Sequence, residues 1–227
     1  MALRQRAKAR AACQTGGGWR NARGWLWQGK DVLRAARRES TSPMFGLFGK
    51  REVKPSPVDA MFTRIVDASR QPALYLDGGI ADDFEGRFES LTLHVFLVMR
   101  RLRELPAPAG DVAQDLVDAC FAYLELGVRN SGTSDIAVPK RMKKIGQMFY
   151  GRVQAYEAAL LAQDPAELAE ALRRNAAPQA SSGEGAAHLA AYARRIQTRL
   201  AQRDLEAILA EAPLFPALQP GETDHGN

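Results

Sequence analysis

The chain is poor in the residues that build disulfides, metal sites and membrane spans. It has only two cysteines, Cys13 and Cys120, and three histidines that lie far apart in the sequence. Two cysteines exclude a disulfide framework and indicate a reducing compartment, and the histidines share no spacing typical of metal ligands. The longest apolar run, 91–99, falls short of the roughly 20 residues that span a bilayer and is interrupted by Thr92 and His94. We expect a cytoplasmic protein without metal or cofactor. At most it is peripheral at the inner face of the cytoplasmic membrane, or on the matrix side in a eukaryote.

Recognisable catalytic motifs are missing as well. The Gly16–Gly18 run lacks the Lys-Ser/Thr pair that a phosphate-binding loop requires. The acidic group of Asp82, Asp83 and Glu85 stands at the expected start of a helix. Carboxylates there are explained by capping of backbone N–H groups and by the helix dipole. The residues therefore favour a binding protein over an enzyme.

Positive charge is concentrated at the N-terminus. Residues 1–43 hold ten Lys/Arg and two acids, whereas the whole chain carries a net charge of only +5. The body from Met44 onward is therefore mildly acidic, which argues against a general polyanion binder and against DNA as a partner. A basic stretch within this body can still steer a partner locally.

The leader over 1–43 has no sustained apolar periodicity, and its composition ends abruptly at Met44. Three interpretations stay open: upstream sequence with Met44 as the true start, an organelle-targeting peptide, or a functional basic arm. The break in composition favours the first. Just after it, Phe45, Leu47 and Phe48 precede cations and suit the headgroup boundary of a membrane.

From Met44 onward, apolar residues recur with helical spacing, and we predict an all-α domain of about six helices. Start signals include Ser56-Pro57, Pro139 and Asp164-Pro165. The strongest helix follows Asp82 or Asp83, with its stripe at Phe84, Phe88, Leu91, Val95, Val98, Leu102 and Leu105. Further apolar residues around its middle predict a central helix packed on more than one side.

The predicted organisation has six parts. A disordered leader over 1–43 and an extended segment over 44–56 precede a helical core over 57–175, in which 71–81 is a loop. A linker over 176–185, a C-terminal helix over 186–212 and a disordered tail over 213–227 follow.

The most informative stretch is the basic start of the helix after Pro139. Lys140, Arg141, Lys143 and Lys144 have no acid near them from Ile136 through Gln154. Four cations on two turns repel one another, which suggests an anionic partner, although a solvated face is the alternative. Further along the helix, Tyr150 and Arg152 lie off its apolar stripe and are additional contact candidates. His94 is open to two interpretations: a buried imidazole bonded to a neighbouring helix, or a functional group.

Several of these residues together resemble the ubiquinol–cytochrome c chaperone family. The likeness spans about 60–175 and is carried by the motif Asp82 to Phe88, by Leu93-His94, and by the run from Asp135 to Tyr156. At one position the chain departs from the family pattern, with Asn130 where an acid is usual.

The resemblance implies a non-catalytic, all-helical assembly factor for the respiratory cytochrome bc complex. Its expected client is newly made cytochrome b, with the ribosome and a small partner protein as further contacts. The partner-binding candidates are Lys140, Arg141, Lys143, Lys144, Tyr150, Arg152, Arg87 and His94. The alternative is a helical RNA- or ribosome-binding module that uses the same basic helix.

Overall fold

The computed structural model describes residues 56–162, 164–178, 183–210 and 213–218. These residues form eight helices and no strand, which confirms the all-α prediction. Six of the helices have ten or more residues: α3 (Pro57–Ser69), α5 (Phe84–Glu104), α6 (Ala109–Asn130), α7 (Val138–Leu161), α8 (Ala166–Asn175) and α9 (Glu184–Ala201). The other two, α4 (Pro72–Leu76) and α10 (Leu205–Leu209), have five residues each. The leader over 1–43 and the proposed membrane contacts Phe45, Leu47 and Phe48 lie outside the described residues.

Helix starts follow the local signals in the sequence. Ser56 and Asp59 form a capping box at α3, in which each side chain accepts a hydrogen bond from the other's backbone N–H at 3.1 Å. Asp83 caps α5 by accepting from the Gly86 N–H at 2.8 Å. Gly86 is required there, because a Cβ on it would lie 1.9 Å from the Ala81 carbonyl oxygen.

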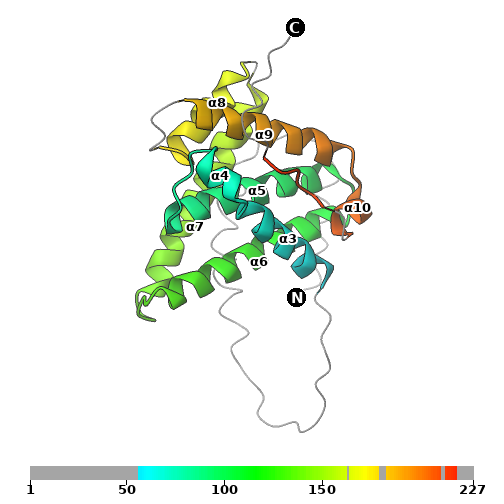
Figure 1. The fold of residues 1–227 in the computed structure, drawn as a ribbon. Coiled ribbons are helices and arrows are strands. Elements are labelled where there is room, and N and C mark those ends of the chain that lie inside the picture. Colours follow the sequence, from blue (N-terminus) through cyan, green and yellow to red (C-terminus); the bar gives the residue numbers. More distant parts are fainter. Residues whose placement is uncertain (1–55, 163, 179–182, 211–212, 219–227) are drawn as a thin grey trace. The chain divides into compact units, whose positions relative to one another are not determined.

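The central helix of the bundle is α5. It packs against α3, α6, α7 and α9, and Figure 1 shows α9 on one side of it and α6 on the other. Its middle is buried all round, with Leu93, Val95, Phe96 and Val98 each fully inaccessible to solvent. Each such side chain contributes about 1.5–3 kcal/mol when it leaves water. The predicted central position of this helix is confirmed.

Two predicted segments differ from the structure. The loop expected over 71–81 contains α4, because Pro72 has the φ angle of a first helical turn and Leu74 is fully buried. The single helix expected over 186–212 is divided into α9 and α10. The division comes at Asp204, whose side chain accepts from the Ala207 N–H at 2.8 Å and so begins a new helix.

Part of the predicted disordered tail is packed on the bundle. Leu214, Phe215 and Leu218 are buried, and the Phe215 ring lies edge-on to His94 with centroids 5.0 Å apart. Apolar burial outweighs the prolines around this segment, which had suggested fraying. None of the described helices is long and apolar enough to cross a membrane.

Candidate partner-binding groove

A hollow of about 340 Å³ lies where the end of α3 meets α4, the start of α5 and the end of α6. We name it the Phe84 groove, and its lining includes Arg70, Tyr75, Phe84, Arg87, Tyr123 and Leu126. Its lining combines aromatic rings, leucine side chains and two guanidinium groups. Such a surface suits an apolar segment with acidic neighbours.

Phe84 occupies a defined place in this groove. Its ring lies 3.9 Å from the position that a Cβ on Gly127 would take, so it packs over the surface of α6 at van der Waals distance. On α7, the Arg141 guanidinium carbon stands 5.3 Å from the centre of the Phe84 ring, a cation–π distance. Phe84 is nevertheless 38% exposed. The sequence placed it on the buried stripe, but as the first residue of α5 it lies beyond the neighbours that cover the rest.

The groove walls are held in place by hydrogen bonds. Arg70 donates to the Tyr123 hydroxyl, and the Phe62 ring meets Tyr123 edge-on at 5.6 Å. The Tyr75 hydroxyl donates to the Ser69 carbonyl at 2.8 Å, and burial raises the pKa of Tyr75. The lining side chains are therefore positioned before any partner arrives, which lowers the entropic cost of binding.

Two exposed leucines lie on the helices that form this groove. Leu126 lines the groove and is 56% exposed; Leu76, which follows Tyr75 in α4 but is not among the lining residues, is 80% exposed. Large apolar side chains gathered at one hollow are a feature of protein contact sites. The signal in the sequence was that Leu126 lies off the buried stripe of its helix.

The predicted binding residues fall into two groups. Arg87, Arg141 and the lysines are exposed; Arg87 lines the Phe84 groove, and Arg141 stands over the Phe84 ring. Arg87 also pairs with Asp82 at 2.8 Å. Lys140, Lys143 and Lys144 lie opposite the buried Met142 and Ile145, as the helix periodicity predicted.

Arg152 and Tyr150 serve the bundle interior. Arg152 makes a two-pronged ion pair with the buried carboxylate of Glu89, with N–O distances of 2.8–3.0 Å. Burial raises the pKa of Glu89, and the Arg152 guanidinium partly offsets this rise. Tyr150 is half-buried and stacks on Phe121 with centroids 6.3 Å apart. These two candidates are structural in this arrangement, because their polar or aromatic groups already have partners.

His94 is fully buried, so its place among the partner-binding candidates is corrected. Its Nδ1 lies 2.7 Å from the Ser90 carbonyl and its Nε2 lies 2.9 Å from the Tyr192 hydroxyl. Since a carbonyl only accepts, Nδ1 carries the proton and Nε2 accepts from Tyr192. Burial lowers the pKa of His94 to about 4, so the neutral ring links α5 to α9.

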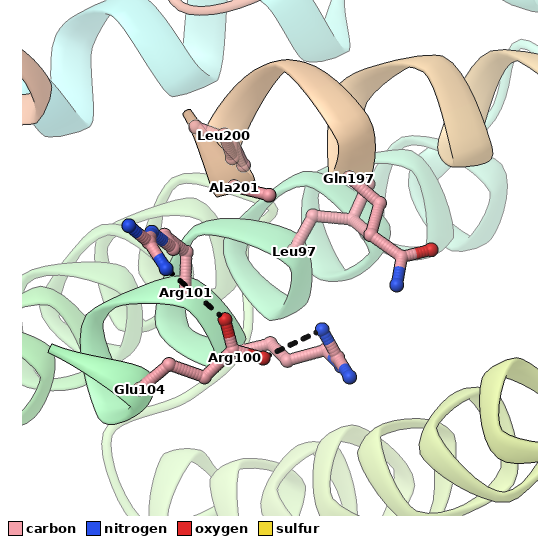
Figure 2. Close-up of a pocket in the computed structure, with 7 residues that line it drawn as sticks. All are labelled: Leu97, Arg100, Arg101, Glu104, Gln197, Leu200 and Ala201. Atoms are coloured by element: carbon pink, nitrogen blue, oxygen red, sulfur yellow. Dashed lines mark hydrogen bonds and ion pairs between the residues drawn. The ribbon is translucent and has the colours of Figure 1, made fainter. Parts of the chain in front are cut away.

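A second hollow, of about 250 Å³, lies between α5 and α9 (Figure 2). Its arginines are already engaged. Arg100 donates to Glu104 at 2.8 Å and to the buried Glu157 at 3.1 Å, and Arg101 donates to the Arg203 carbonyl at 2.8 Å. In the described ranges, no three His, Cys, Asp or Glu residues are placed to hold a metal ion.

A family model and a solved structure both match this chain. A family model described as ubiquinol-cytochrome C chaperone matches residues 76–215, more than half of the chain. The crystal structure of the Cbp3 homolog from Brucella abortus is similar, with a TM-score of 0.65 and 32% sequence identity. That match covers 86% of this chain and 96% of the Brucella chain. No curated protein matches. The family match reaches α9 and α10, a region that the resemblance noted in the sequence covered poorly.

Proposed function

The chain belongs to the ubiquinol–cytochrome c chaperone family, and on that basis we propose that it is a non-enzymatic assembly chaperone for the cytochrome bc complex. Its client is newly made cytochrome b, held at the Phe84 groove with the basic start of α7 alongside. The observation that carries the proposal is that the exposed side chains of Phe84 and Leu126 lie at one hollow with the exposed guanidinium group of Arg87, while Arg141 stands over the Phe84 ring.

The chemistry of the groove suits a segment of an unassembled membrane protein. Such a segment presents apolar side chains that need cover before insertion or assembly. Phe84 and Leu126 offer exposed apolar area in the groove for this contact. Arg87 and Arg141 add charge for acidic groups at the ends of the segment, because guanidinium groups bind carboxylates in two-pronged geometry. The ribosome and a small partner protein, which the family resemblance implies, remain further proposed partners of this chain.

Site-specific photocrosslinking in cells tests the proposal. A photoreactive amino acid at Leu126, in the groove, should capture cytochrome b during its synthesis. The matched control is Ala191, an exposed position on α9. Equal capture at both positions, or capture at neither, would contradict the groove assignment.

A functional variant provides the second measurement. Leu126→Glu places a carboxylate in the groove at a half-exposed position, so the fold should persist while the apolar contact is lost. We expect less cytochrome b at a normal level of chaperone. Ala191→Glu, which adds the same charge elsewhere, should leave cytochrome b unchanged. If both variants leave it unchanged, the groove does not serve the client.

A further inference from the structure

The outer face of α7 carries an exposed aliphatic residue among lysines. Ile136, just before the helix, is 93% exposed. The N–H groups of Ala137 and Val138 both donate to the Ser134 carbonyl, at 2.8 and 3.1 Å, so the helical path begins one turn before α7. With 3.6 residues per turn, Ile136 lies within about 40° of Lys140 and Lys143 around the helix axis. Lys144 stands one turn beyond Lys140.

These charges are not neutralised within the described residues. None of the three lysines has a carboxylate within ion-pairing distance in the described ranges. The one acid of α7 is Glu157, which is buried and bonded to Arg100. Asp135, beside Ile136, pairs with Arg129 at 2.6 Å. The face around Ile136 therefore presents uncompensated positive charge together with an apolar tip.

We propose that this face, made of Ile136, Lys140, Lys143 and Lys144, docks on an anionic lipid bilayer. The lysine ammonium groups bind lipid phosphates, and the Ile136 side chain enters the boundary between headgroups and acyl chains. An RNA backbone would also attract the lysines, but it offers no apolar layer for an aliphatic side chain. Ile136 therefore favours the bilayer as the partner.

The geometry links this docking to the groove. Arg141 lies on the same turns of α7 as the lysines but points to Phe84. Docking of the lysine face would therefore place the Phe84 groove close to the bilayer surface. A chaperone held there meets an apolar client as it reaches the membrane. The docking itself is measured on purified protein, so it can fail without affecting the client proposal, and the reverse also holds.

The test must report membrane contact at position 136 itself, because the basic residues over 1–43 give the full chain a second source of attraction to anionic vesicles. The full chain with Cys13→Ser and Ile136→Cys is labelled with an environment-sensitive fluorophore; Cys120 is buried and its pKa is raised to about 12, so it does not react. Vesicles of phosphatidylcholine with anionic phosphatidylglycerol should shift the emission to the blue. Label at Thr198→Cys, exposed on α9, should show no shift.

Charge variants complete the experiment. Lys140→Gln with Lys143→Gln should lower the vesicle partition measured by the position-136 label about 25-fold, because each lysine near an anionic surface contributes roughly fivefold. Arg195→Gln with Arg199→Gln, a matched pair of exposed cations on α9, should leave it unchanged. The proposal is overturned if anionic vesicles cause no shift at position 136 or if both charge pairs matter equally. It is also overturned if RNA binds through these lysines and vesicles do not.

Discussion

Arg152 on α7 holds the buried carboxylate of Glu89 on α5 with two N–H groups, at 2.8–3.0 Å. Glu89 is 5% exposed, so its charge has left water and depends on this partner. The pair joins the central helix to the helix that carries the basic face. Arg152 therefore stabilises the bundle, whereas the lysines of α7 face outward.

Loss of Arg152 should destabilise the protein. Arg152→Met leaves a buried carboxylate without its countercharge, and we expect a loss of about 3 kcal/mol, near the low end for such pairs because Arg152 is partly exposed. The double variant Glu89→Met with Arg152→Met should regain most of this stability. Urea unfolding followed by circular dichroism measures both. A single variant as stable as the wild type would show that the pair contributes little.

The two glycines Gly86 and Gly151 should respond in opposite directions to alanine. At Gly86 a Cβ would collide with the Ala81 carbonyl, so we expect Gly86→Ala to cost more than about 2 kcal/mol and to disturb the groove. At Gly151 nothing lies within 4 Å, and the helix gains from alanine by up to about 1 kcal/mol. Thermal melting compares the two. Equal effects would contradict the close approach at Gly86.

Acid should weaken the bundle through His94. Its pKa is lowered from 6.5 to about 4 by burial, so the unfolded chain binds a proton between these values and the folded chain does not. The contribution of His94 to the free energy of unfolding is therefore fully present above about pH 6.5. It falls by roughly 3 kcal/mol in total as the pH drops toward 4. The difference in unfolding free energy between wild type and His94→Gln, measured from pH 7 to 4, isolates this contribution. A difference that does not change with pH would exclude His94 as its source.

Phe215 should contribute to stability although it lies in a proline-rich segment. It is 9% exposed and packs edge-on against His94. Phe215→Ala should lower the free energy of unfolding by about 3 kcal/mol, the low end of the usual range for a buried aromatic ring. Pro216→Ala, at the next position, is the control for a local change in the chain. Equal melting temperatures for wild type and Phe215→Ala would show that this segment does not hold the bundle.

The sequence by itself determined the features that depend on near neighbours. The all-α class and the starts of α3, α5, α7 and α8 follow from caps, prolines and apolar spacing, which act within one or two turns. The outward direction of Lys140, Lys143 and Lys144 follows from the same periodicity, because it needs only the position of the buried stripe. Breaks such as the one at Asp204 were missed, since the apolar pattern continues across them.

Only the tertiary structure decided which distant residues meet. Glu89 and Arg152 are 63 positions apart, and His94 and Tyr192 are 98 apart. Such pairs depend on how the helices cross, and local spacing carries no information about that. For the same reason the sequence could propose Arg87 and Arg141 as contacts but could not show that Arg87 lines the groove or that Arg141 lies over the Phe84 ring. The packing of α5 against α7 brings Arg141 to the Phe84 ring and Arg152 to Glu89, and the packing of α5 against α9 buries His94 beside Tyr192.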